Sequence, residues 1–170
     1  MKIEIVQNAK EVECDVLIVN KFLDELTSSP VINKFAPKSF KGNPGEIFYI
    51  HTQGELLSKY VMAVGFGSEK DVDNNIIRES IAKAVKKCKE LEAKKIAIDI
   101  QSDSLFGIST ILGAELVNYS FDKYKTKKDH KISKLYISNV SSIPKQKYII
   151  FAYFSQWMPT FVYCNVSKLD

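Results

Sequence analysis

Residues 60–65, Tyr-Val-Met-Ala-Val-Gly, begin an alternation of strand and helix patterns that continues to residue 138. This apolar run is short, as expected of a strand buried within a sheet. The patterns after it predict a helix near 72–92, a strand at 95–100, a helix near 104–121 and a strand at 134–139. Strands that alternate with helices need crossover connections, so we expect a mostly parallel sheet with helices on its faces. The predicted class is α/β, with three layers in the order α/β/α.

The two predicted helices differ in how clearly the sequence defines them. In the first, apolar residues from Ile77 to Leu91 fall on one helical face, and either Asp71 or Asp73 is placed to cap its first turn. The second contains Gly113, which costs about 1 kcal/mol relative to alanine inside a helix. We therefore expect close packing at Gly113.

Three more strands are predicted toward the N-terminus, at residues 2–7, 15–20 and 46–51. The strand at 46–51 forms a plausible hairpin with the strand at 60–65. Residues 22–45 are ambiguous, because a short helix could start near Phe22 but Pro30 and Pro37 interrupt the pattern. Residues 42–45, Gly-Asn-Pro-Gly, have the composition of a turn.

Length and charge describe one ordinary domain. The chain has 170 residues and a net charge of +4, too mild an excess to indicate a nucleic-acid-binding protein by itself. Its three cysteines, Cys14, Cys88 and Cys164, are widely spaced and are expected to be reduced thiols. The N-terminus has no signal-peptide pattern. Together these features predict a cytoplasmic protein.

No residue pattern of a catalytic, cofactor-binding or metal site is present. The two histidines, His51 and His130, stand outside any HExxH motif. Residues 64–67, Val-Gly-Phe-Gly, lack the spacing of a phosphate-binding loop and predict a tight strand exit. Asp15, Asp99 and Asp103 lie at or just beyond predicted strand ends, where ligand sites of α/β proteins gather, but capping and turn roles explain them equally well.

Residues 123–134 contain six lysines. A solvated surface loop is the usual outcome of such a run. The alternative is contact with a polyanion such as DNA through Lys125, Lys127 and Lys128.

The segment after residue 142 departs from the preceding patterns. Seven aromatic residues fall between Tyr148 and Tyr163, and no charge occurs from Tyr148 to Cys164. Three interpretations stay open: a strand or helix packed on the sheet, a membrane contact, or sequence that did not evolve to fold there. We expect no membrane span, and we expect residues 144–170 to be the least ordered part or to bury their aromatic rings by association.

Residues 111–128 resemble the end of the N-terminal domain of leucine aminopeptidases, with Tyr119, Phe121, Asp122 and Tyr124 in a lysine-rich segment. Further similar segments precede it: Asp15 to Asn20, the turn at 41–46, the strand exit at 60–67, and Ile77-Arg78-Glu79 with the helix that follows. The resemblance covers about residues 1–140. It implies a macrodomain-like α/β domain at 1–142, followed by a divergent aromatic tail at 143–170.

The resemblance also sets expectations about function. The family's metal-binding Asn-Thr-Asp-Ala-Glu-Gly-Arg motif is absent, so no catalytic or metal residue is assigned to this chain. It implies the non-catalytic N-terminal domain of a metallo-exopeptidase that removes N-terminal residues from peptides, in a truncated or isolated form. The two zinc or manganese ions would belong to a catalytic domain that this sequence lacks. Expected partners are the chain itself or that catalytic domain, with DNA as a weaker candidate.

A second resemblance is to ADP-ribose-binding macrodomains. Asp15, Val19 and Asn20 are similar to the start of the macrodomain strand whose aspartate binds adenine. The sequence then departs, because Lys-Phe-Leu follows Asn20 and no glycine-rich phosphate loop appears. The resemblance implies an alternative function, in which Asp15 and Asn20 bind ADP-ribose or another nucleotide.

Overall fold

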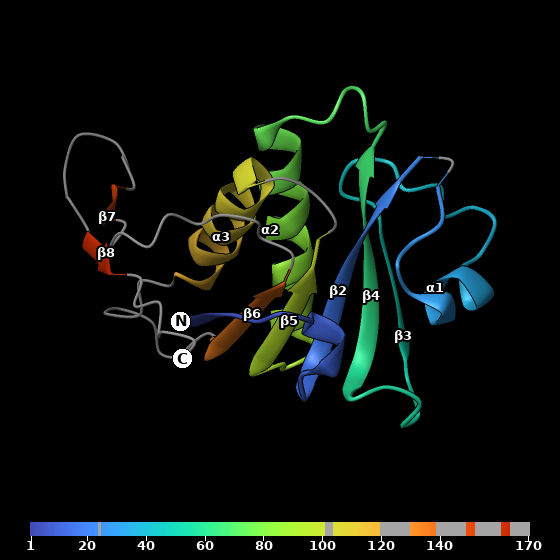
Figure 1. The fold of residues 1–170 in the computed structure, drawn as a ribbon, viewed down its shortest axis with the longest axis horizontal. Helices are drawn as coiled ribbons and strands as arrows, with labels where there is room; N and C mark the ends of the chain where they lie inside the picture. The colour runs from blue at the N-terminus through green and yellow to red at the C-terminus, as the bar shows by residue number, and fades with distance from the viewer. Residues whose placement is uncertain (24, 101–103, 120–129, 139–148, 152–160, 164–170) are drawn as a thin grey trace.

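A computed structural model describes residues 1–23, 25–100, 104–119, 130–138, 149–151 and 161–163. Its centre is a six-stranded sheet in the order β1-β6-β5-β2-β4-β3 (Figure 1). All neighbouring strands pair in parallel except β3, which runs antiparallel to β4. The predicted α/β class and the mostly parallel sheet are confirmed. The strands are β1 (Lys2–Ile5), β2 (Cys14–Phe22), β3 (Ile47–His51), β4 (Ser58–Gly67), β5 (Lys95–Asp99) and β6 (Lys134–Ser138).

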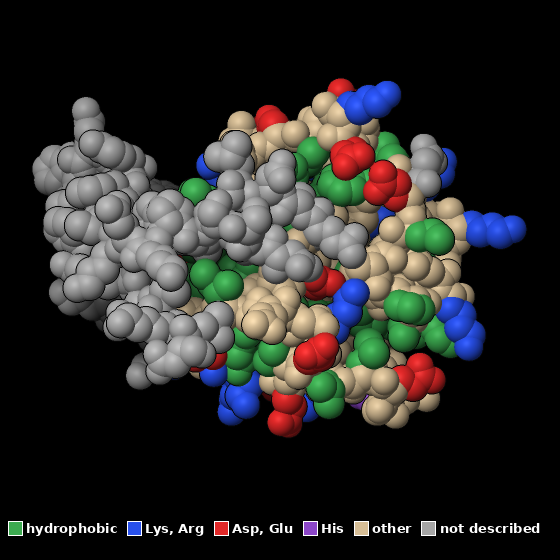
Figure 2. Space-filling model, in the orientation of Figure 1, with side chains coloured by type: hydrophobic (Ala, Val, Ile, Leu, Met, Phe, Trp, Pro, Cys, Tyr) green, Lys and Arg blue, Asp and Glu red, His purple; other side chains and the backbone are tan. Residues whose placement is uncertain are grey.

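One face of the molecule carries charges of both signs. In Figure 2, lysine or arginine side chains are interspersed with acidic side chains among the described residues of this face, and hydrophobic side chains lie between them. This distribution agrees with the small net charge of +4.

Two long helices, α2 (Asn74–Glu90) and α3 (Ser104–Asn118), pack side by side on one face of the sheet (Figure 1). Asp73 caps α2, since its Oδ1 accepts hydrogen bonds from the backbone N–H groups of Asn75 at 2.9 Å and Ile76 at 2.7 Å. The predicted cap is thereby confirmed for Asp73. The helices α2 and α3 meet at Gly113, where an added Cβ would lie 2.5 Å from the backbone oxygen of Arg78. The expected close packing at Gly113 is present.

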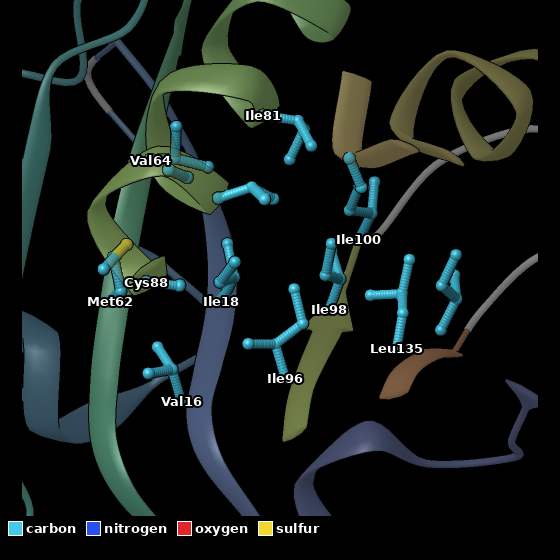
Figure 3. Packing of buried hydrophobic residues seen from close by; sticks show 14 of the residues in the cluster. Val16, Ile18, Met62, Val64, Ile81, Cys88, Ile96, Ile98, Ile100 and Leu135 are labelled. Carbon is cyan, nitrogen blue, oxygen red and sulfur yellow. The ribbon is translucent and has the colours of Figure 1, made fainter. Parts of the chain in front are cut away.

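The larger hydrophobic core lies between these helices and the sheet (Figure 3). Alternate residues of the central strands, such as Val16 and Ile18 of β2 and Met62 and Val64 of β4, point into it and are fully buried. From α2 it receives Ile81 and its neighbours one turn away. Alternate residues of the strands and one face of α2 therefore form a single core, as the sequence patterns predicted.

The opposite face of the sheet is covered by much shorter elements. Leu17, Val19, Val61 and Ala63 pack there against residues from the 3-10 helix η1 (Ala9–Glu11), the helix α1 (Pro30–Phe35) and Phe40. This region corrects the prediction for residues 22–45. Phe22 ends β2 and begins no helix. Pro30 is the first residue of α1, a position where proline is tolerated because its missing N–H would have no partner in the helix.

Two short strands lie outside the main sheet. β7 (Ile149–Phe151) and β8 (Phe161–Tyr163) pair antiparallel in a sheet of their own. The rest of the segment 143–170 lies outside the described residues. The prediction about order and association of the aromatic tail therefore stays a prediction, as does the boundary at residue 142.

Candidate functional site

The glycine-containing turn at 41–46 packs directly on the end of β4. The N–H of Gly67 donates to the oxygen of Gly42 at 2.8 Å, and the N–H of Gly45 donates to the oxygen of Gly65 at 2.9 Å. A Cβ added to Gly65 would come within 2.1 Å of the Asn43 oxygen. The predicted tight strand exit is confirmed: these glycines allow two backbone segments to touch.

The same turn builds a small anion-binding nest. One carboxylate oxygen of Glu46, Oε2, accepts hydrogen bonds from the backbone N–H groups of Lys41, Gly42 and Asn43 at 3.2, 2.9 and 2.9 Å. Consecutive N–H groups that converge on one point favour a negative charge there. The nest holds a carboxylate of the chain itself, so it fixes the entry into β3.

Asp15 lies at the start of β2, where its carboxylate joins three elements. Its Oδ2 accepts hydrogen bonds from the N–H groups of Lys94 and Lys95 at 2.8 and 2.9 Å, and its Oδ1 contacts the Lys59 ammonium at 2.7 Å. Burial acts to raise the pKa of Asp15, but the hydrogen bonds from Lys59, Lys95 and Lys94 outweigh it, so the pKa is lowered. In this structure the carboxylate therefore fastens the start of β5 to β2.

Asn20 lies toward the other end of the same strand and is buried. Asn20 follows Asp15 by five positions, which correspond to about 16 Å of extended strand, and this odd spacing places the two side chains on opposite faces. The structure thus does not bring this pair of nucleotide-binding candidates together.

Asn20 instead shares the carboxyl edge of the sheet with Asp99. Val19 is in register with Asp99, and Asp99 is in register with Ser138 on β6. In open α/β sheets, ligands bind outside this edge of the strands. Of the three aspartates predicted at strand ends, Asp99 is therefore the one placed at the edge typical of a site, whereas Asp103 lies outside the described residues.

The Asp99 carboxylate is 2% exposed and is surrounded by polar partners. Its Oδ1 accepts from the Ser138 hydroxyl at 2.9 Å, and its Oδ2 accepts from the Ser28 hydroxyl at 3.1 Å. The Lys10 ammonium lies 3.2 Å from Oδ2 and also donates to the oxygen of Ser28. We call these four residues the Asp99 cluster. It ties η1, the loop before α1 and β6 to the end of β5.

Lys10 and Ser28 were not singled out from the sequence. Both residues are far from Asp99 in the sequence, and Ser28 is 71 residues away from it. Neither belongs to a motif. A buried aspartate at a strand end requires partners, but nothing local says which residues supply them.

The described thiols and histidines form no reactive group. Burial raises the pKa of the Cys14 thiol to about 12 and also raises the pKa of the Cys88 thiol, so both are protonated at neutral pH. His51 is exposed at the end of β3, where its Nδ1 accepts from the N–H of Gln53. His130 is half-buried and hydrogen-bonds through Nε2 to the oxygen of Ala93.

The described residues contain neither a metal-binding cluster nor a membrane-spanning helix. Within the described ranges, no group of three or more His, Cys, Asp or Glu side chains is placed to hold a metal ion. No helix among the described residues is long and apolar enough to cross a membrane. Lys125, Lys127 and Lys128 lie outside the described residues.

A sequence model described as the N-terminal domain of the cytosol aminopeptidase family matches residues 6–128. The chain belongs to this family. The matched range covers β2 to α3, the glycine turn and the strand exit, so the segments that suggested the family resemblance lie inside it.

Relatives in the family are similar to about three quarters of the chain. A probable cytosol aminopeptidase of Alkaliphilus oremlandii is 28% identical in an alignment of 145 positions that covers 74% of this chain and 29% of that protein. One of a Sulfurihydrogenibium species is 30% identical in an alignment of 131 positions that covers 74% of this chain and 25% of that protein. The chain thus spans less than a third of the length of these relatives.

Solved structures show the same fold. A mutant of tomato leucine aminopeptidase superposes with a TM-score of 0.65 at 17% identity, over 85% of this chain and 33% of that chain. The bottromycin maturation enzyme BotP superposes with a TM-score of 0.58 at 15% identity, over 74% of this chain and 27% of that one. At these identities the similarity concerns the fold alone.

Proposed function

We propose that the chain acts as the non-catalytic N-terminal domain of a cytosol aminopeptidase, with a structural role in assembly with a catalytic domain. The observation that carries the proposal is the family match itself, which covers residues 6–128 and concerns the N-terminal domain only. The peptide-cleaving centre and its two zinc or manganese ions belong to the catalytic partner in this proposal. Because the relatives are named cytosol aminopeptidases, the proposed place of action is the cytoplasm.

The outer face of α3 supports a role in assembly. Ile108 and Leu116 of α3 and Tyr119, the residue that follows the helix, are 40%, 42% and 59% exposed, and we call them the α3 outer stripe. Ile108 and Leu116 are eight residues apart, so they lie on one side of the helix two turns from each other. Large apolar side chains aligned in solvent are typical of a surface that another protein covers.

Glu115 beside the stripe supports the same view. Burial raises the pKa of this half-buried carboxyl group. It is the sole charged residue in the sequence of α3. The helix therefore has almost no charge to keep its outer face in water, as expected of a helix that is covered in the working assembly.

Two alternatives stay predictions. Binding of ADP-ribose near Asp15 and Asn20 would have to compete with Lys59, Lys94 and Lys95 for the Asp15 carboxylate. Contact with DNA rests on Lys125, Lys127 and Lys128, which lie outside the described residues.

The non-catalytic part of the proposal is tested with leucine p-nitroanilide. Purified full chain is incubated with the substrate and with zinc or manganese, and the full-length probable cytosol aminopeptidase of Alkaliphilus oremlandii serves as positive control. We expect no hydrolysis above buffer from the chain alone. Metal-dependent hydrolysis that a chelator abolishes would overturn the proposal.

A further inference from the structure

The outer edge of β3 is an unpaired strand edge. β3 is the last strand of the sheet and pairs with β4 alone. Backbone hydrogen bonds to β4 are made by the oxygen of Glu46 and the N–H of Thr52. Because bonded positions alternate in an antiparallel pair, the N–H and C=O groups of Ile47, Tyr49 and His51 point away from β4. Among the described residues, no backbone hydrogen bond to these outward groups is found.

The strand itself lacks the features that normally protect an edge. Residues 47–51, Ile-Phe-Tyr-Ile-His, include no lysine, no acidic residue and no proline. The one irregularity precedes the strand, where Gly45 and Glu46 both bond to Gly65. Natural sheets protect exposed edges with inward charges, proline or bulges, and an edge without them is ready to pair with another strand. Tyr49 stands on it with 37% of its surface exposed.

Two lysines of α2 flank this edge. The Lys87 ammonium lies 5.4 Å from the centre of the Tyr49 ring. The Lys83 ammonium lies against Gly45, where an added Cβ would approach it to 2.5 Å. Lys87 also contacts Glu90 at 2.9 Å, whereas no ion pair of Lys83 is found in the described part of the chain. The edge is therefore apolar along its length and basic beside it.

This charge decides between possible occupants. A second copy of the chain, paired antiparallel through β3 of each copy, would bring the same lysines toward each other, and like charges disfavour that arrangement. A segment with acidic side chains would meet Lys83 and Lys87 while its backbone bonds to Ile47, Tyr49 and His51. We propose that the edge of β3 binds an extended, acidic peptide segment by strand addition, a function beyond assembly with a catalytic domain.

The test is a titration of the full chain with a labelled, end-blocked heptapeptide that alternates valine and glutamate. Binding is followed by fluorescence anisotropy, and the amide signals of Ile47, Tyr49 and His51 are followed by NMR. We expect saturable binding with shifts at these three amides. A peptide of the same length with lysine in place of glutamate should bind more weakly. Salt should weaken binding of the acidic peptide, because Lys83 is exposed and Lys87 is partly exposed.

Two changes separate strand addition from simple charge attraction. Tyr49→Pro removes an outward N–H at a position where an edge strand tolerates proline. This variant should bind the acidic peptide about tenfold or more weakly. Circular dichroism shows whether this variant is folded. If it is not, the same test is made on wild-type protein with an acidic peptide that carries N-methyl groups at alternate residues and so lacks those backbone N–H donors. The Lys83→Glu variant should bind acidic peptides more weakly than wild type and should melt at the same temperature.

Three results would overturn the proposal. One is equal binding of the acidic and the lysine peptide, and another is equal binding of the N-methylated peptide. The third is a dimer of the free chain that Tyr49→Pro converts to monomer, which would make a second copy the occupant of the edge.

Discussion

Asp99 at the carboxyl end of β5 and Lys10 in η1 form an ion pair of 3.2 Å, in which the carboxylate is almost fully buried and the ammonium is half-exposed. Asp99→Ala removes the acceptor shared by Lys10, Ser28 and Ser138. We expect a loss of about 2–4 kcal/mol in the free energy of unfolding, because buried donors are left without a partner. Urea unfolding followed by circular dichroism measures it.

The control for this prediction is Lys10→Met. Lys10 is 38% exposed in its side chain, so its loss leaves Asp99 with both serine hydroxyls and should cost less than Asp99→Ala. Equal stability of Asp99→Ala and wild type would show that the Asp99 cluster does not hold the carboxyl edge together.

Asp73 and Asp71 make a matched pair for the cap of α2. Asp73→Ala should cost about 1 kcal/mol, since two N–H groups of the first turn lose their acceptor. Asp71 is exposed and bonds through its backbone N–H to the oxygen of Ser68, so Asp71→Ala should stay within about 0.5 kcal/mol of wild type. Chemical denaturation of both variants checks the pair, and a larger loss for Asp71→Ala would assign the cap to the wrong residue.

Gly113→Ala tests how closely α3 packs on α2. Alanine favours helices over glycine by about 1 kcal/mol, so an open site would be stabilised. Here the new Cβ would meet the backbone oxygen of Arg78 at 2.5 Å, and we expect a net loss of about 1–3 kcal/mol. A rise in melting temperature would contradict the close contact of the two helices.

Glu115 predicts how the stability of the fold depends on pH. Burial raises its pKa in the folded state, so the folded protein holds this proton more tightly than the unfolded chain does. The ionised carboxylate therefore destabilises the fold above the folded pKa. This penalty shrinks as the pH falls below the folded pKa and is gone below the unfolded pKa. We expect Glu115→Gln to raise the melting temperature at pH 7. The gain should shrink toward pH 4, and a gain independent of pH would exclude this cause.

The strands and the two long helices could be predicted from the sequence because their signals are local and periodic. Residues of β2 and β4 alternate between two cores, and the apolar positions of α2 repeat at helical spacing. The family resemblance likewise rested on local segments, and the match over residues 6–128 confirms it.

What could not be predicted depends on contacts between distant residues. Pro30 was interpreted as an interruption, yet it starts α1, because proline is unfavourable inside a helix and acceptable at its first position. The partners of Asp99 come from η1, the loop before α1 and β6. No sequence spacing indicates that these three segments meet at one carboxylate.

The most direct test of the proposed role is assembly with a catalytic domain. The full chain is mixed with the separately expressed catalytic domain of the probable cytosol aminopeptidase of Alkaliphilus oremlandii, and sedimentation velocity measures complex formation. The account predicts a stoichiometric complex that wild-type chain forms and that Leu116→Glu, in the α3 outer stripe, weakens about tenfold or more. Glu79→Ala, on the exposed surface of α2, should bind like wild type. Two species that sediment independently at all concentrations would contradict the assembly role.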